Sequence, residues 1–134
     1  MQKNPVELRE AVHDSAIKWL KIVLSNKTEL VLPEVKSPHG EFFDELQDEI
    51  GLFPVGEELP YKERERLFCN TGDWHDVSRF AEIINSITDY KLVAYIILWK
   101  MRTVRNKIWS QDYREFFIVG FERLIGLTET DTNS

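Results

Sequence analysis

The chain has 134 residues, of which 43% are hydrophobic, and its formal net charge at pH 7 is −6. A chain of this length forms one domain with a core large enough to fold without a disulfide or a structural metal. The acidic balance argues against non-specific nucleic-acid binding, which requires a net positive field.

The single cysteine, Cys69, cannot form an intramolecular disulfide, which is typical of proteins from a reducing compartment. The amino-terminal stretch is polar and lacks the apolar segment of a signal peptide. The longest apolar run, Leu92–Trp99, covers eight residues, whereas a membrane span requires about 18. We therefore expect a soluble, cytoplasmic protein with no membrane partner.

The first predicted helix begins at Asn4-Pro5, because asparagine caps helices and proline is favoured at the first helical position. It is expected to end at about Ser25. Its apolar stripe follows helical spacing and consists of Leu8, Ala11, Val12, Ala16, Trp19, Leu20 and Val23. The next stretch, 28–35, contains Pro33 and is predicted to be an extended connection or a short edge strand.

A second helix is predicted from Ser37-Pro38 to Ile50, and Gly51 stands where a helix often ends in glycine. Its apolar stripe consists of Phe42, Phe43, Leu46 and Ile50. Its opposite face is predicted to carry the acidic residues Glu41, Asp44, Glu45, Asp48 and Glu49. The segment 29–58 as a whole holds nine acidic residues and one basic residue, so acidic charge is concentrated here.

The segment 52–60 contains prolines and a glycine and is therefore predicted to be a loop. Its first residues, Leu52 and Phe53, are expected to fold back onto the core, while Glu57 and Glu58 stay in water. A short helix is predicted to follow over 61–68.

The next helix is predicted to be capped by Asp73, and its apolar stripe consists of Phe80, Ile83, Ile84 and Ile87. The run Leu92–Trp99 then belongs to a central helix that we expect to start at Thr88-Asp89 and to end at about Trp109. A buried strand is the alternative for so apolar a run. We favour the helix because the amphipathic pattern continues to Val104 and because no comparable second strand is present to pair with it.

The last helix is predicted to begin at Ser110 and to end before Gly126. Its stripe consists of Tyr113, Phe116, Phe117, Gly120, Phe121 and Leu124. The glycine in this stripe, Gly120, would allow another helix to approach closely. Residues 128–134 are polar and are predicted to form a disordered tail.

These patterns together predict an all-α fold. We expect a single compact bundle of five to six non-repeating helices over residues 1–127, arranged around a central buried helix at about 89–109.

Residue types that carry catalysis or bind metals do not form a usable pattern. Cys69 and His75 could meet at one turn as nucleophile and base, but no signature of a catalytic cysteine surrounds them. The ligand-type side chains near His13, His39 and Asp73 lack a spacing that places two ligands on one helix face. We therefore expect no enzyme activity, no metal and no cofactor.

The segment Arg9-Glu-Ala-Val-His13 resembles the motif of a family of helical ribonucleases, in which an arginine and a histidine stand on one helix with a longer spacer between them. The shorter spacer moves His13 away from the expected turn, and Glu10 replaces the usual polar residue beside the arginine. The resemblance covers these residues alone, and the competing interpretation is an ordinary pair on the wet face of the first helix.

A basic run follows the apolar centre of the chain: Lys100, Arg102, Arg105 and Lys107. It could contact RNA or phosphate. We favour the interpretation that these cations complement the carboxyl end of their helix and pair with the acidic helix.

The acidic surface is the feature that bears most directly on function. A row of carboxylates on a rigid helix attracts a basic cleft, and inhibitors of nucleases cap the substrate channel with such a row. We expect a binding protein that neutralises a basic partner, most readily an immunity protein or antitoxin that blocks a nuclease toxin. The expected partner-binding residues are Glu41, Asp44, Glu45, Asp48, Glu49, Phe53, Glu57, Glu58 and Trp74.

Three alternatives stay open at this point. One is an enzyme or RNA-binding helical module that uses Asp73, His75 and the basic residues of 100–107. Another is a dimeric regulatory subunit that interacts through its apolar last helix, and the third is an acidic face that only confers solubility. The identity of the partner and the oligomeric state are left open by the sequence.

Overall fold

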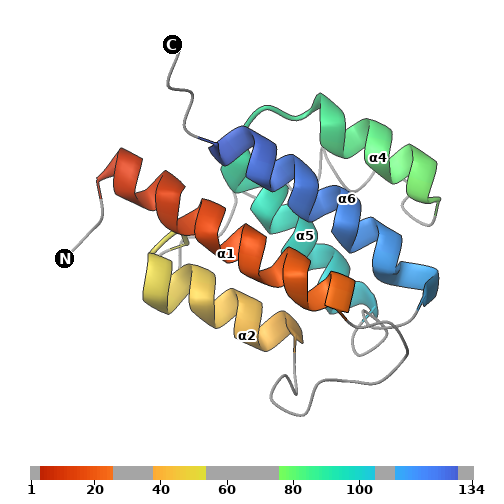
Figure 1. Ribbon diagram of the computed structural model, residues 1–134, viewed down its shortest axis with the longest axis horizontal. Coiled ribbons are helices and arrows are strands. Elements are labelled where there is room, and N and C mark those ends of the chain that lie inside the picture. The colour runs from red at the N-terminus through yellow and green to blue at the C-terminus, as the bar shows by residue number, and fades with distance from the viewer. Residues whose placement is uncertain (1–3, 26–37, 54–75, 105–110, 130–134) are drawn as a thin grey trace.

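The computed structural model describes residues 4–25, 38–53, 76–104 and 111–129, and all regular structure within these ranges is helical (Figure 1). The elements are α1 (Pro5–Ser25), α2 (Pro38–Asp44), the π-helical segment η1 (Glu45–Ile50), α4 (Val77–Ser86), α5 (Tyr90–Val104) and α6 (Gln111–Thr128). The expected all-α bundle is therefore confirmed. The predicted connection at 28–35 and the predicted short helix at 61–68 lie outside the described residues.

The helices begin where a side chain accepts a hydrogen bond from one of the first backbone amides. Asn4 Oδ1 accepts from the Glu7 amide at 2.8 Å, and the Glu7 carboxylate accepts from the Asn4 amide at 3.4 Å, which forms a capping box. At α4 the cap is Asp76, whose carboxylate accepts from the Ser78 amide at 2.8 Å. The prediction that Asp73 caps this helix was wrong, because the capping side chain must stand directly before the first helical residue.

The two predicted glycine-marked ends differ in outcome. Gly51 follows η1 with a φ of 80°, the left-handed conformation that glycine adopts without strain, so this end is confirmed. By contrast, α6 continues through Gly126 to Thr128, and the predicted end before Gly126 was wrong. The Thr128 hydroxyl donates to the Leu124 carbonyl at 2.7 Å, which lets this polar residue be buried in the last helical turn instead of belonging to the polar tail.

Helix α5 is buried along most of its length, whereas α6 is the helix that packs against the most other helices. Every residue from Leu92 to Leu98 is buried, and the run is helical, so the alternative of a buried strand does not hold. Helix α5 packs against α6 and α2, and α6 packs in addition against α1 and α4 (Figure 1). The described part of α5 ends at Val104, and the predicted end near Trp109 lies outside the described residues.

Helices α5 and α6 approach each other closely at Gly120. A Cβ atom at this position would lie 2.8 Å from Cγ1 of Ile97, which is shorter than a van der Waals contact. The expectation that this glycine permits a close approach is therefore confirmed. The rings of α6 extend the packing to its neighbours, where Phe121 meets Phe42 of α2 edge-on with the ring centroids 5.6 Å apart.

Candidate functional site

The acidic face predicted on the second helix is mostly exposed. Glu41, Asp44, Asp48 and Glu49 are exposed along α2 and η1. In the part of the chain that the structure describes, no basic side chain forms an ion pair with Glu41, Asp44 or Asp48. Their negative charge is therefore available to a positive group from outside this part of the chain.

Glu45 is the exception on this face, because its side chain is buried against α1. Its carboxylate accepts hydrogen bonds from the Ser15 hydroxyl and from Trp19 Nε1, the latter at 2.8 Å, and it pairs with the Lys18 ammonium. A buried carboxylate is destabilising unless donors surround it, and these three groups are such donors. The expectation that Glu45 faces solvent was wrong, and the residue instead fastens α2 and η1 to α1.

A hollow of about 210 Å³ lies beside Glu45, between α1 and the acidic helix. Two of its lining residues, Trp19 and Ile22, are apolar. The others are charged, and they are Lys18, Glu41, Asp44, Glu45 and Glu49. We refer to this feature as the acidic hollow. It combines an apolar wall with an excess of carboxylates, which is a combination suited to a long basic side chain.

The remaining residues predicted to bind a partner have mixed outcomes. Phe53 is buried, and its ring meets the Tyr95 ring edge-on with the centroids 6.0 Å apart. The expectation that it folds back onto the core is confirmed, and its role as an anchor for a partner stays a prediction. Glu57, Glu58 and Trp74 lie outside the described residues.

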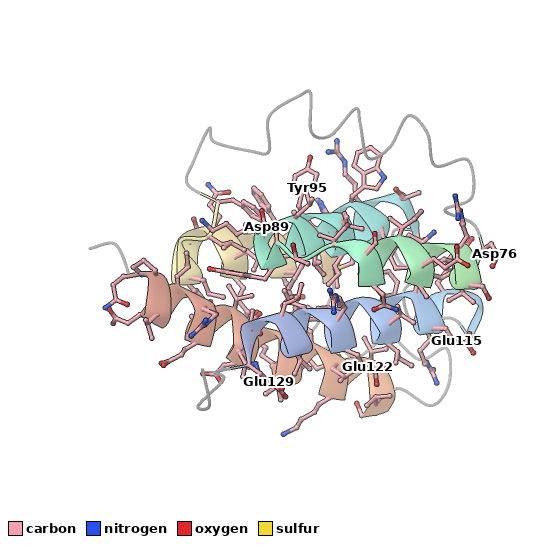
Figure 2. The ribbon with its side chains drawn as sticks, turned by 90° about the horizontal axis from the view of Figure 1, so that it is seen from above. Asp76, Asp89, Tyr95, Glu115, Glu122 and Glu129 are labelled. Atoms are coloured by element: carbon pink, nitrogen blue, oxygen red, sulfur yellow. The ribbon has the colours of Figure 1, made fainter. Side chains whose placement is uncertain are left out.

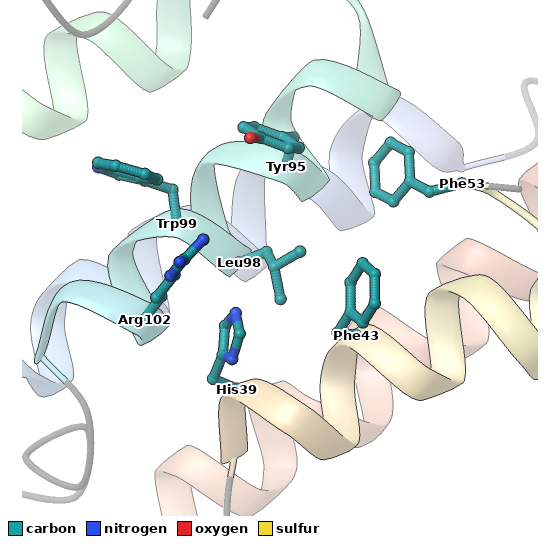
Figure 3. A pocket seen from close by; sticks show the side chains of 7 residues that line it. All are labelled: His39, Phe43, Phe53, Tyr95, Leu98, Trp99 and Arg102. Atoms are coloured by element: carbon teal, nitrogen blue, oxygen red, sulfur yellow. The ribbon is translucent and has the colours of Figure 1, made fainter. Parts of the chain in front are cut away.

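A second cavity, of about 280 Å³, lies between α2 and α5 (Figure 3). Its lining consists of His39 and Phe43 from α2, Phe53 from the segment after η1, and Tyr95, Leu98, Trp99 and Arg102 from α5. We refer to it as the aromatic pocket. No sequence pattern had brought these residues together, although residues 95, 98, 99 and 102 have the spacing of one helix face and include two aromatic residues and a base.

Two of the lining residues, His39 and Arg102, carry basic groups, and these lie beside each other at one end of the aromatic pocket (Figure 3). Burial lowers the pKa of His39 below its usual value of 6.5, and the positive charge of Arg102 lowers it further, so the imidazole is neutral at pH 7. Its ring is stacked on Phe43, with the centroids 6.5 Å apart and the planes 8° from parallel. Arg102 is exposed, and within the described residues no carboxylate forms an ion pair with it.

Lys100 does not contribute to an exposed basic patch as the sequence had suggested. The side chain is buried, and its Nζ atom lies 4.0 Å from the centroid of the Phe116 ring and 5.7 Å from that of Tyr113. Burial lowers the pKa of Lys100, while the negative faces of the rings offset part of the lost hydration. Of the basic run, Arg105 and Lys107 lie outside the described residues.

The residues considered for catalysis are not assembled into a site by the described part of the chain. His13 is half-buried, and its Nδ1 lies 3.1 Å from Thr128 Oγ1, so His13 contacts the end of α6 and the expectation of a wet-face pair with Arg9 was wrong. Cys69, Asp73 and His75 lie outside the described residues. Among the residues that are described, no group of histidine, cysteine, aspartate and glutamate side chains could hold a metal ion.

Comparison with known proteins adds no assignment, since no protein-family model, no curated protein and no solved structure matches the chain. Within the four described ranges, none of the helices has the length and apolar character needed to cross a membrane. The functional interpretation therefore depends on the two surfaces beside α2, the acidic hollow and the aromatic pocket.

Proposed function

We propose that the chain is a small, acidic, cytoplasmic binding protein that neutralises a basic protein partner, and that this partner is a nuclease toxin. The observation that supports the proposal is the acidic hollow. Its lining holds four carboxylates and one ammonium group beside an apolar wall, so it attracts a positive charge and also offers surface to a hydrocarbon stem.

The hollow suits an arginine or lysine side chain from the partner. Trp19 and Ile22 would contact the stem of such a side chain, while Glu41 and Asp44 would accept hydrogen bonds from its charged head. Arginine is the better fit, because its planar guanidinium binds a carboxylate through two parallel hydrogen bonds and is more weakly hydrated than an ammonium group.

The burial of Glu45 supports the same proposal indirectly. Because Glu45 is bound by Ser15 and Trp19, the backbone that carries Asp44 and Asp48 is held against α1 before any partner arrives. A fixed row of carboxylates loses less conformational entropy on binding than a mobile one. It also accelerates association with a basic nuclease cleft, and the acceleration declines as salt is added.

Charge reversal on the acidic helix tests the proposal. The test variant combines Glu41→Lys, Asp44→Lys and Asp48→Lys, and the matched control combines Glu115→Lys, Glu122→Lys and Glu129→Lys. The control residues are exposed, with Glu115 and Glu122 on α6 and Glu129 directly after its end (Figure 2). Each variant replaces three acidic residues by lysine, so both variants have the same net charge. With a labelled arginine-only peptide as the probe, we expect the test variant to bind at least about tenfold more weakly, or about 1.4 kcal/mol, and the control to change much less.

An equal loss in both variants would show that net charge, and not the acidic helix, governs binding. The nuclease part of the proposal needs its own measurement. The probe is the protein encoded by the gene next to this one, and its nuclease activity is measured with and without the wild-type chain. Inhibition by the wild type that is lost in the α2 variant and kept in the α6 variant is the expected result, and no inhibition by the wild type contradicts it.

A further inference from the structure

The aromatic pocket has the size of a site for a small molecule. Its volume is about 280 Å³. An apolar cavity of about 150 Å³ is large enough to hold benzene, and sites for drug-sized ligands start at about 300 Å³. A compound with two fused rings lies between these limits.

The walls of the pocket favour a flat ligand. Four of its seven lining side chains carry phenyl, phenol or indole rings, and these are Phe43, Phe53, Tyr95 and Trp99. Two neighbouring contacts fix ring orientations, since Phe53 meets Tyr95 at 86° and Phe43 lies parallel to His39 within 8°. Aromatic rings attract a further ring by stacked or edge-on contact as well as by burial of apolar surface.

One end of the pocket favours a single negative charge. Arg102 is the charged residue in the lining, and its guanidinium presents donors in the planar arrangement that matches a carboxylate. The burial of His39 keeps its imidazole neutral at pH 7, so it adds no second positive charge there. A neutral imidazole still donates one hydrogen bond, which a carboxylate oxygen beside Arg102 can accept.

We propose that the aromatic pocket binds a small planar aromatic carboxylate, with its rings among Phe43, Tyr95 and Trp99 and its carboxylate on Arg102. A phosphate fits this lining less well. A dianion in a mostly apolar cavity requires more than one cation, and the lining contains one arginine and a neutral histidine. The site lies between α2 and α5, whereas the acidic hollow lies between α1 and the acidic helix, so the two proposals can be tested separately.

The test uses the full chain and naphthalene-2-carboxylate as the probe, with binding measured by titration calorimetry. Naphthalene-2-carboxamide has nearly the same shape without the charge, and it serves as the control ligand. We expect one saturable site for the carboxylate and at least tenfold weaker binding of the carboxamide, because the amide cannot pair with Arg102.

Two variants and one matched control locate the site. Arg102→Gln should weaken carboxylate binding at least tenfold and leave carboxamide binding nearly unchanged. Lys91→Gln removes a cation from an exposed position on the same helix and should leave both ligands unchanged. Leu98→Trp fills the pocket and should abolish binding of both ligands, provided that circular dichroism shows the helices intact.

Several results would overturn the proposal. Carboxylate binding that survives Arg102→Gln or Leu98→Trp would place the probe elsewhere on the molecule. Equal affinity for the carboxylate and the carboxamide would show that the charge of Arg102 is not used. If naphthalene-2-carboxylate does not bind, the proposal is refuted. This holds even if a peptide that ends in a free phenylalanine carboxylate binds to the pocket.

Discussion

On one side of α5, Ile97 meets α6 so closely that a Cβ atom at Gly120 would lie 2.8 Å from its Cγ1. On the other side, the next residue along the chain, Leu98, lines a cavity of about 280 Å³ between α5 and α2. Helix α5 thus has one tightly packed interface and one open interface. We call the contact of α5 with α6 at Ile97 and Gly120 the closed seam, and the interface of α5 with α2 at the aromatic pocket the open seam. Tight packing on the α6 side holds the bundle together, so the α2 side can remain open without loss of the fold.

The residue types explain the difference between the seams. A glycine on α6 lets two backbones approach, whereas on α2 the facing positions are held by the rings of His39 and Phe43. These rings are stacked on each other, and both line the aromatic pocket. In addition, α2 and η1 are fastened to α1 through Glu45. The open seam is therefore set by contacts on the far side of α2 as well as by its own residues.

Among the substitutions that test this difference between the two seams, Glu45→Ala is expected to have the largest effect on stability. The change leaves the Ser15 hydroxyl and Trp19 Nε1 buried without their acceptor, and each lost partner costs about 1–3 kcal/mol. We expect the free energy of unfolding, measured by urea denaturation, to fall by about 2–4 kcal/mol. Glu45→Gln retains an acceptor oxygen and should lose less.

The neighbouring acid is the control for that prediction. Asp44 is exposed, so Asp44→Ala should change the free energy of unfolding by no more than about 0.5 kcal/mol. If Glu45→Ala were as mild as Asp44→Ala, the contact between η1 and α1 would not determine stability.

The closed seam is tested by two glycines of the same helix. Gly120→Ala overpacks the contact with Ile97 at a cost of about 1–3 kcal/mol, and the better helix propensity of alanine offsets about 1 kcal/mol of it. We expect a net loss of about 1 kcal/mol in the free energy of unfolding. Gly126→Ala meets no atom within 4 Å and should instead stabilise the chain by about 0.5–1 kcal/mol.

A double-mutant cycle sharpens the same test. In an Ile97→Ala background the added methyl group at Gly120 has space, so Gly120→Ala should lose most of its cost and show a coupling energy of at least about 0.5 kcal/mol. Additive effects would mean that the two helices shift apart freely, and the seam would not be closed in the sense described.

The closed seam could be anticipated from the sequence, because helical spacing marked the apolar stripe of α6 and Gly120 within it. Glu45 was misassigned because its charge was taken to require solvent. It stands three residues after Phe42, so helical geometry already placed it on the buried face. Its donors, Ser15 and Trp19, lie on a different helix, and periodicity within one helix does not say which other helix it faces.

For the aromatic pocket, too, periodicity within one helix does not identify the helix that lies opposite, and here the consequence is larger. The spacing of Tyr95, Leu98, Trp99 and Arg102 predicts one face of α5. What lies opposite this face depends on how α2 is placed. That placement includes the π-helical segment η1, which the apolar spacing of the second helix does not distinguish from an ordinary α-helix. The open seam depends on tertiary structure, and the sequence pattern identifies only the residues that α5 contributes to it.

The smallest expected effect concerns the pH dependence of the free energy of unfolding, and it tests the electrostatic environment of the open seam. Burial, and then the charge of Arg102, hold the pKa of His39 in the folded chain below the unfolded value of 6.5. Between the lowered pKa and 6.5 the unfolded chain therefore binds more protons, so the free energy of unfolding increases as pH rises through this window and decreases as pH falls through it.

Denaturation of the wild type and His39→Gln at a series of pH values isolates this contribution, because the other titrating groups are shared. We expect the wild type to lose more stability than His39→Gln on acidification below 6.5, and Arg102→Gln to reduce the difference, since it removes the second of the two causes. Identical pH profiles of wild type and His39→Gln would mean that folding does not change the pKa of His39, which would contradict the contributions of both burial and Arg102.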